Sequence, residues 1–382
     1  MSKRRKNILI TGGNFTNQGA YLMLCAAAEQ IRSRWGAQPV IAMQTGSERA
    51  KRWVGLDSLL EFPKLRIRVW GGNPERLSGL RHRMPFVVGS EIDAVFDVSG
   101  FVFSDEWAHL DLRRRADDLI RWSDRGVPVV LLPQAFGPLE QVTEPVADLL
   151  DSCELVYARD PDSARFLKGA ARSRSAYEKI AVATDFTTAL APEEPRGLSH
   201  LRGMVPIVPN WNIAKRAAAR GGSKDDYMRN LQEIVRVLRA HDYEVYGLCH
   251  EGGGDADLLH TLAGTCGGMP VIEGLDGRQS KWLLGQAPFI VSGRFHALVS
   301  ALSQGVPGLV HGWSHKYKWL SEEYDVSGLV MDPYENPNSV DTFLSRRLGE
   351  IQRIRESVSE LAIVKKAETE QMWDDIEKRI EL

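Results

Sequence analysis

The chain has 382 residues, of which 43% are hydrophobic and 26% charged, and a chain of this length is expected to form two domains. Its 48 Lys and Arg residues nearly balance 50 Asp and Glu residues, and the net charge of −2 argues against a general nucleic-acid binder. The four cysteines form no C-x-x-C pair, so the sequence offers neither a zinc site nor a disulfide framework. No apolar run approaches the roughly 18 residues of a membrane span, which predicts a cytoplasmic protein with at most peripheral membrane contact.

The first half of the chain alternates short apolar runs with amphipathic segments. The apolar runs predict strands near residues 6–10, 40–43, 66–70, 93–100, 126–134 and 154–160. The clearest helices between them are predicted over residues 21–35 and 110–125. Strands that alternate with helices imply an open parallel sheet.

The second half repeats this pattern after a segment that is rich in Pro, Gly and charge. Strands are predicted near residues 203–210, 243–250, 269–274, 288–293 and 306–312, with helices over 225–241, 256–266, 280–286 and 296–304. We therefore predict an α/β protein with two Rossmann-like, doubly wound domains that face a cleft. The domains are residues 1–190, expected as the acceptor side, and residues 204–335, expected to hold the donor or anion site, with a linker over 191–203. A helical tail, 336–382, packs back on the first domain or stays solvated as a free helix.

Ligands of such sheets bind beyond the carboxyl ends of the strands, so the loops at these ends are the candidate sites. The first loop, "TGGNFTNQGA", carries Asn14 and Asn17 among three glycines and precedes a helix start that favours negative charge, although a plain tight turn is the alternative. Gln134 follows another strand and is expected to shape the cleft floor. Asp105 and Glu106 are candidate bases, with a solvated loop as the alternative reading.

Two further loops carry cationic or titratable side chains. Arg159 ends a strand beside Asp160, which fits either a ligand contact or a structural ion pair. His250 lies in the glycine-rich loop "GLCHEGGGDAD" and is a candidate ligand contact.

The stretch from residue 289 to 320 gives the strongest signal. Arg294 offers a planar donor fork that suits phosphate or carboxylate. His296 lies where the following helix begins, and Lys316 follows the next strand. Because both strands are expected to be neighbours, these three side chains predict an anion site.

The motifs of both halves together resemble those of the polysaccharide pyruvyl transferases. The family pattern Gly-x-Arg-(Leu/Met)-His-Ala, then Gly-Val-Pro, then a Lys-containing turn, is similar to residues 293–297, 305–307 and Lys316. Weaker matches are Gly13, Asn14, Asn17 and Gly19 in the first loop, and residues 134–138 and 156–160. The resemblance extends over nearly the whole chain, to about residue 335.

This resemblance implies a glycosyltransferase-B-like fold and a ketal pyruvyltransferase of cell-surface polysaccharide or glycan biosynthesis. Members use phosphoenolpyruvate as donor and join pyruvate to two hydroxyls of a sugar, with no cofactor and no obligatory metal. By the same resemblance His296 is the general acid, and Arg159, Arg294 and Lys316 hold the phosphate and carboxylate of the donor. The expected partners are phosphoenolpyruvate and a saccharide carried on a lipid or a nucleotide, and the sequence leaves a homo-oligomer open.

One departure separates this chain from the family. Many members continue Asn-x-Gly with Asp-Glu, whereas this chain has Ala20-Tyr21, so the base is another residue (Asp105, Glu106 or His250) or the acceptor differs. Two alternatives stay open. One is a nucleotide-sugar glycosyltransferase of the same fold, with Glu273 as the carboxylate for the ribose, and the other is a non-catalytic relative that binds a sugar or phosphate.

Overall fold

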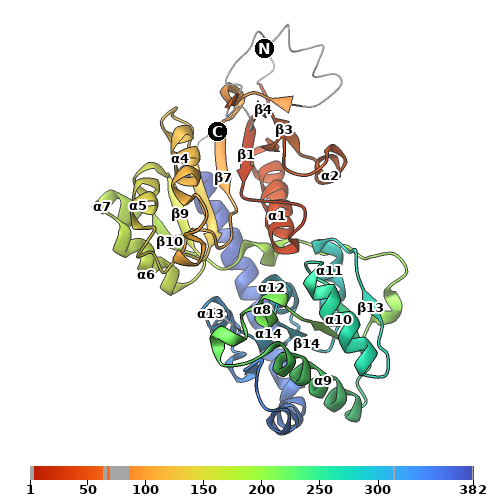
Figure 1. Cartoon of the computed structure of the whole chain (residues 1–382). Helices are drawn as coiled ribbons and strands as arrows, with labels where there is room; N and C mark the ends of the chain where they lie inside the picture. The colour runs from red at the N-terminus through yellow and green to blue at the C-terminus, as the bar shows by residue number, and fades with distance from the viewer. Residues whose placement is uncertain (1–3, 63–66, 69–85, 313–314, 381) are drawn as a thin grey trace. The chain divides into compact units, whose positions relative to one another are not determined.

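The computed structural model describes residues 4–62, 67–68, 86–312, 315–380 and 382. The contacts between residues divide the chain into two compact units, and Figure 1 labels many of their helices and strands. The first unit comprises residues 1–16, 20–186 and 368–382, and the second comprises residues 17–19 and 187–367.

The first unit is built on an eight-stranded sheet in the order β10-β9-β8-β7-β1-β2-β3-β6, in which every pairing is parallel. Its strands are β1 (Asn7–Thr11), β2 (Gln38–Ala42), β3 (Asp57–Leu59), β6 (Phe86–Val87), β7 (Ala94–Asp97), β8 (Val129–Gln134), β9 (Leu155–Ala158) and β10 (Ile180–Val182). The chain winds outward from β1 in one direction and from β7 in the other. The switch point of this doubly wound sheet therefore lies between β1 and β7.

The strand predicted at residues 66–70 does not belong to the eight-stranded sheet. Its described part is β5 (Ile67–Arg68), which pairs antiparallel with β4 (Glu61–Phe62) in a separate two-stranded sheet. Residues 66, 69 and 70 lie outside the described residues.

Helices cover both faces of the eight-stranded sheet, which explains why its strands are apolar at nearly every position. They are α1 (Gln18–Trp35), α2 (Glu48–Val54), α4 (Leu112–Ser123), α5 (Thr143–Ser152), α6 (Pro161–Ala170) and α7 (Arg174–Glu178). Leu9 and Val95 share a core cluster with residues of α4 and α5, such as Trp122 and Leu149. Asp160 caps α6 by accepting a hydrogen bond from Ser163 N, and Pro161 is the first helical residue.

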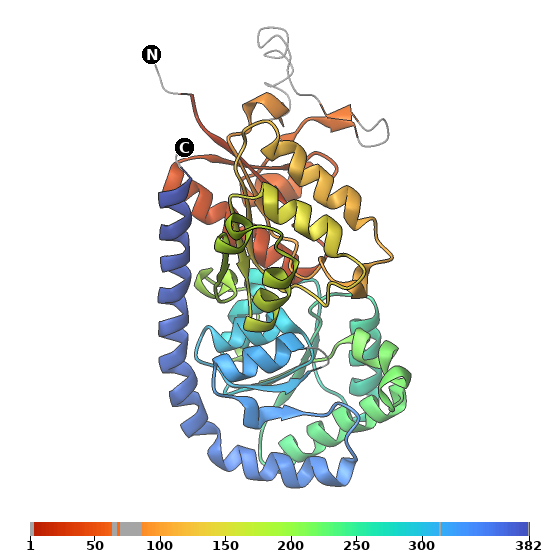
Figure 2. The same ribbon diagram turned by 90° about the vertical axis from the view of Figure 1, so that its left-hand side faces the viewer.

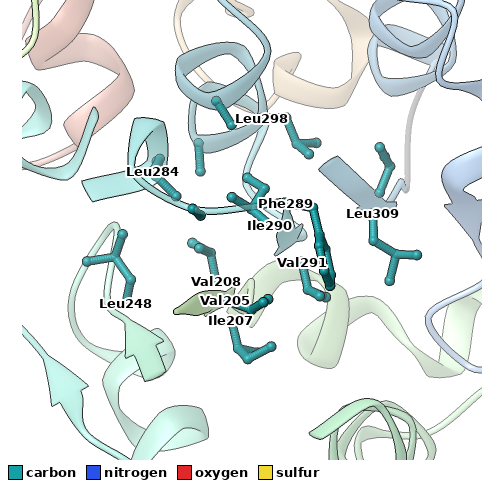
Figure 3. Packing of buried hydrophobic residues seen from close by; sticks show 14 of the residues in the cluster. Val205, Ile207, Val208, Leu248, Leu284, Phe289, Ile290, Val291, Leu298 and Leu309 are labelled. Atoms are coloured by element: carbon teal, nitrogen blue, oxygen red, sulfur yellow. The ribbon is translucent and has the colours of Figure 1, made fainter. Parts of the chain in front are cut away.

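The second unit contains a six-stranded parallel sheet in the order β13-β12-β11-β14-β15-β16. Its strands are β11 (Val205–Val208), β12 (Val245–Leu248), β13 (Val271–Ile272), β14 (Ile290–Ser292), β15 (Gly308–His311) and β16 (Val330–Met331). This is the 3-2-1-4-5-6 order of a dinucleotide-binding domain, with its switch point between β11 and β14. Figure 3 shows buried side chains of the central strands, among them Ile207, Val291 and Leu309, gathered with Leu284 and Leu298 in one core.

The helices predicted over residues 225–241, 256–266, 280–286 and 296–304 are present within three residues of these bounds, whereas the helices Trp211–Arg216 and His315–Glu323 were not predicted. The helices of the second unit are α8 (Trp211–Arg216), α9 (Lys224–Ala240), α10 (Gly254–Thr265), α11 (Gly277–Gly285), α12 (Phe295–Leu302), α13 (His315–Glu323) and α14 (Pro337–Arg379). The prediction of two Rossmann-like parallel sheets with a long C-terminal helix is confirmed.

The segment predicted as a linker begins in contact with α11. Arg278 Nε donates to the carbonyl of Ala191 at 3.1 Å, and Glu193 N donates to the carbonyl of Arg278 at 3.1 Å. Just before it, the buried Lys281 Nζ donates to Thr187 O at 2.6 Å. These bonds place residues 187–193 in the second unit, so the units divide after residue 186 rather than at 190.

The helical tail is one continuous helix, α14, which Figure 2 shows in blue. Its residues up to 367 belong to the second unit, and the turns from residue 368 onward pack within the first. Trp373 is fully buried there, with its ring centroid 6.1 Å from those of Phe96 and Phe186. Tyr157 Oη donates to Asp375 at 2.7 Å, and Arg34 pairs with Asp374 at 2.6 Å.

Candidate functional site

The switch point of the second unit is held by hydrogen bonds from two sides. Asn210, which follows β11, donates its Nδ2 to the carbonyl of Gly293 at 2.7 Å. Tyr317 of α13 donates its hydroxyl to the same carbonyl at 2.8 Å. Ser292 Oγ accepts from Arg294 N at 3.0 Å. The loop between β14 and α12 therefore has a defined conformation, which orients the side chains that follow it.

Arg294 leaves this loop and enters a network of carboxylates. Its Nε donates to Asp255 Oδ2 at 2.8 Å and its Nη2 donates to Asp255 Oδ1 at 2.6 Å, and its Nη1 pairs with Glu251. The Asp255 side chain is fully buried, whereas 28% of the Glu251 side chain is exposed. Glu251 also accepts a hydrogen bond from Asn17 Nδ2. The sequence predicts that the guanidinium faces a ligand, and the structure instead gives most of its donors to protein carboxylates.

Burial disfavours the charged forms of both Arg294 and Asp255. Burial lowers the pKa of Arg294 to about 10, which still leaves it protonated. Burial raises the pKa of Asp255, but the N–H of Trp211 and the two bonds from Arg294 favour its carboxylate form. Asp255 is thus the fully buried partner of Arg294, and Glu251 is its partly exposed partner.

His296 is the second residue of α12, as predicted, and packs against the first turn of α1. A Cβ added to Gly19 would lie 2.2 Å from His296 Nδ1, so the backbone of Gly19 touches the imidazole ring directly. Residues 17–19 belong to the second unit, as His296 does. Only glycine fits here, which gives the Gly of the first loop a steric role beside His296.

We expect Gly19→Ala to lower turnover about 100-fold, because the new methyl group displaces His296 from its position. Steady-state kinetics on a variant with an unchanged circular dichroism spectrum test this. Gly264→Ala is the matched control, since nothing lies within 4 Å of a Cβ at that helical position. A Gly19→Ala enzyme with wild-type turnover contradicts the proposed contact.

His250 lies at the end of β12 near Arg294 and His296. Burial lowers its pKa to about 3, with help from the positive charges of these two residues. It is therefore a neutral imidazole at neutral pH, and among the described residues its buried Nε2 has no hydrogen-bond partner. A neutral His of this kind suits a hydrogen bond to a ligand better than charge pairing.

Lys316 approaches the same helix start from α13. Its Nζ lies 5.4 Å from the ring centroid of Phe295 and 5.6 Å from that of Tyr317. The rings of Phe295 and His296 are in turn 5.4 Å apart in an edge-to-face arrangement. The second unit thus contains Asn17, His250, Arg294, His296 and Lys316, and the expectation that β14 and β15 are neighbours is confirmed. That the cations beyond these two strands form an anion site stays a prediction.

Two buried histidines make the stability of the fold depend on pH. Burial also lowers the pKa of His311, to about 4, and both histidines have ordinary values near 6.5 in the unfolded chain. Below about pH 6.5 the unfolded chain binds more protons, so the free energy of unfolding falls as pH falls. At about pH 5 the loss is about 2 kcal/mol for each histidine. In urea denaturation, the free energy of unfolding of His311→Leu is expected to fall less steeply as pH falls than that of the wild type. The control is His109→Ala, because His109 is exposed, and its free energy of unfolding is expected to change with pH as in the wild type.

The predicted site residues of the first unit have structural partners. Arg159 is buried and its Nη1 donates to Asp185 at 2.9 Å, a different carboxylate from the neighbouring Asp160 of the ion-pair alternative. Gln134 is fully buried and donates to Asp97 at 3.1 Å. Asn14 Oδ1 accepts from Thr16 N at 3.1 Å in a local turn. Their roles in substrate binding remain predictions.

Two candidate carboxylates of the sequence analysis are also engaged. Asp105 accepts hydrogen bonds from the backbone N–H groups of Glu140 and Gln141 at 2.8 and 2.9 Å. Glu273, the candidate for a ribose contact, accepts from the exposed His260 at 2.8 Å.

The most informative residue that the sequence analysis missed is Asp255. A signal was present, because an acidic residue in the first turn of the helix after β12 lies beside the neighbouring strand ends. Among the residues that the structure describes, no three His, Cys, Asp or Glu side chains gather as a metal site, and no helix is long and apolar enough to cross a membrane.

Comparisons with known proteins show the family and the fold of the chain. A model of the family described as polysaccharide pyruvyl transferase matches residues 17–315. The structure is similar to UDP-GlcNAc 2-epimerase from Neisseria meningitidis bound to UDP-GlcNAc, with a TM-score of 0.61, 10% identity, and coverage of 97% of this chain and 100% of that one. It is similar to S. aureus MnaA with UDP, with a TM-score of 0.62, 12% identity, and coverage of 98% of this chain and 96% of that one. It is also similar to Acinetobacter baumannii MurG, with a TM-score of 0.51, 12% identity, and coverage of 98% of this chain and 100% of that one.

No curated protein matches the sequence. At these low identities the structural likenesses show the fold alone, which is glycosyltransferase-B-like as the resemblance implied.

Proposed function

Because the chain belongs to the polysaccharide pyruvyl transferase family and is a transferase, we propose that it moves pyruvate from phosphoenolpyruvate onto two hydroxyls of a sugar as a cyclic ketal. The observation that carries this proposal is the group of His296, Arg294, Lys316 and the neutral His250 at one switch point. This group combines a proton donor with cations for a donor of about three negative charges.

We assign the exchangeable position in this site to Glu251. A donor phosphate or carboxylate takes the Nη1 of Arg294 from Glu251, while Asp255 keeps Nε and Nη2 in place. Lys316 supplies a second positive charge from α13. Exchange of one anion for another at this guanidinium adds no further cost for desolvating Arg294, which is already buried.

The proposed reaction begins when the His296 imidazolium protonates the methylene carbon of phosphoenolpyruvate. The adjacent carbon becomes cationic, and the first acceptor hydroxyl attacks it and loses its proton. Phosphate then leaves, and the second hydroxyl closes the ketal. One hydroxyl proton restores His296 and the other departs with phosphate, so the atoms and charges balance.

The test is to incubate the protein with phosphoenolpyruvate and a panel of saccharides and to follow product mass and phosphate release. A mass gain of pyruvate minus water on one saccharide is the expected result. A thermal-shift comparison separates the rival function: stabilisation by UDP-sugars and none by phosphoenolpyruvate would support a nucleotide-sugar glycosyltransferase instead.

A further inference from the structure

Three neighbouring strands of the second unit end at the same level, and a polar side chain follows each of them. β12 and β14 pair with β11 from its two sides, and Ile207 of β11 is in register with both. His250 comes two residues after β12, and Asn210 and Arg294 come two residues after β11 and β14. Because neighbouring strands lie about 4.8 Å apart, the backbones at His250 and Arg294 are separated by roughly 10 Å. Their side chains can therefore contact one ligand from two sides.

The loop that carries His250 also reaches Arg294. Glu251, the next residue, pairs with Arg294 Nη1, and Asp255 accepts from its Nε and Nη2 at 2.8 and 2.6 Å. Gly253 lies between the two carboxylates with a φ of 53°, a left-handed conformation that suits glycine. These contacts tie the loop after β12 to the loop after β14, so His250 lies beside the proposed donor site.

One ring nitrogen of His250 is buried and has no task in the fold. Only 3% of the residue is exposed, and within the described part of the chain its Nε2 has no hydrogen-bond partner. Buried polar atoms in folded proteins are paired in the great majority of cases. Burial, and then the positive charges of Arg294 and His296, lower the pKa of His250. The imidazole is therefore neutral without a ligand, and an anion beside it favours its protonation.

The proposed reaction needs a second proton carrier besides His296. His296 gives its proton to the methylene carbon and recovers one from the second hydroxyl. The adduct that the first hydroxyl forms still holds phosphate as an ester, and a C–O bond that broke without a proton would expel the phosphate trianion, a poor leaving group. A proton on the bridging oxygen lets hydrogen phosphate leave instead. The first hydroxyl loses a proton at this stage, so one group that takes this proton and passes it on meets both needs.

We propose that His250 Nε2 takes the proton of the first acceptor hydroxyl and passes it to the bridging oxygen of the departing phosphate. The bond from the hydroxyl oxygen to the donor carbon forms as the proton reaches His250, and the bond from that carbon to the phosphate oxygen breaks as the proton leaves. His250 is thus neutral before and after the step. Exchange of Glu251 for the donor opens the ring nitrogen to the acceptor, and His296 is neutral by then because its proton is on carbon.

This inference rests on the proposed function and assigns the base that the Ala20-Tyr21 departure leaves open. Asp105 accepts hydrogen bonds from two backbone N–H groups, so both oxygens of that candidate are engaged. Asp105 and Glu106 also belong to the first unit, whereas His250 shares the second unit with the proposed acid. Among the three candidate bases, the position of His250 fits the role best.

A single-turnover experiment separates the role of His250 from that of His296. Protein in excess is mixed with phosphoenolpyruvate and the saccharide that forms the ketal, and samples are quenched in alkali, because acid would itself expel phosphate. Mass spectrometry distinguishes two species: the adduct weighs as much as the saccharide plus phosphoenolpyruvic acid, and the ketal as much as the saccharide plus pyruvic acid minus water. The variants His250→Gln and His250→Asn stay polar but cannot carry a proton at neutral pH. His260→Gln is the matched control, since His260 is exposed and pairs with Glu273.

We expect both His250 variants to form the ketal about 10²- to 10⁴-fold more slowly and to accumulate the phosphate-bearing adduct. His296→Ala is expected to accumulate neither species, because its block precedes the adduct. The affinity for phosphoenolpyruvate, measured by calorimetry, is expected to stay within about 10-fold of the wild type, the effect of one neutral hydrogen bond.

Three results would overturn the role of His250 and leave the function intact. They are ketal formation by the variants at the wild-type rate, a slow reaction in which no adduct appears, and loss of phosphoenolpyruvate binding in both variants, which would make His250 a donor-binding residue. A wild-type protein that forms neither adduct nor ketal with any saccharide of the panel would reject the proposed function, and this role with it.

Discussion

Replacing His296 with Ala is expected to lower kcat for pyruvyl transfer by a factor of about 10² to 10⁴, the usual contribution of a positioned general acid. The reason is that the methylene carbon of phosphoenolpyruvate is protonated only when a proton donor lies beside it. The contact between His296 and Gly19 fixes the position of the imidazole ring. Phosphate release under saturating phosphoenolpyruvate and acceptor measures the effect.

The donor affinity of this variant is expected to stay close to that of the wild type, because Arg294 and Lys316 carry the permanent charges. Calorimetry with phosphoenolpyruvate checks this point. His260→Ala is the control, since His260 is exposed on α10 and pairs with Glu273 at the surface. Near-normal turnover in His296→Ala would exclude His296 as the acid.

Replacing Asp255 with Ala is expected to lower the free energy of unfolding by about 3–5 kcal/mol. The substitution removes both hydrogen bonds to Arg294 Nε and Nη2 and leaves a largely buried guanidinium with Glu251 as its remaining carboxylate partner. Urea denaturation at neutral pH measures the change.

Asp257→Ala provides the comparison on the same helix. Asp257 is exposed in the first turn of α10, so its loss costs only a favourable interaction with the helix dipole, below about 1 kcal/mol. Asp255→Asn keeps the volume and one acceptor oxygen, and its stability is expected to fall between the wild type and Asp255→Ala. Equal stability of Asp255→Ala and Asp257→Ala would show that the buried ion pair contributes nothing measurable.

The apolar runs and helical periods of the sequence were enough to predict most strands and helices of both sheets. Local patterns of this kind reflect burial on both faces of a parallel sheet, as for Ile207 and Val291, which lie in the centre of the second core. The motif from residue 289 to 320 also located the catalytic candidate, because Arg294 and His296 lie next to each other at one strand end. The short β5 was placed wrongly because a two-residue antiparallel strand carries too little periodicity to separate it from the main sheet.

The partners of these residues were decided only by the tertiary structure. Asp255 lies 39 residues from Arg294 along the chain, and Asn17 lies 234 residues from Glu251. The strand order of the second unit brings the ends of β11, β12 and β14 side by side, and no local propensity encodes that order. The sequence by itself determined which strand end carries the cations. Only the folded chain decided that a buried carboxylate pairs with Arg294 and that Gly19 must lack a side chain beside His296. The same holds for a cavity of the first unit that Asp97 and Arg115 line. Each of these features depends on contacts between segments far apart in sequence.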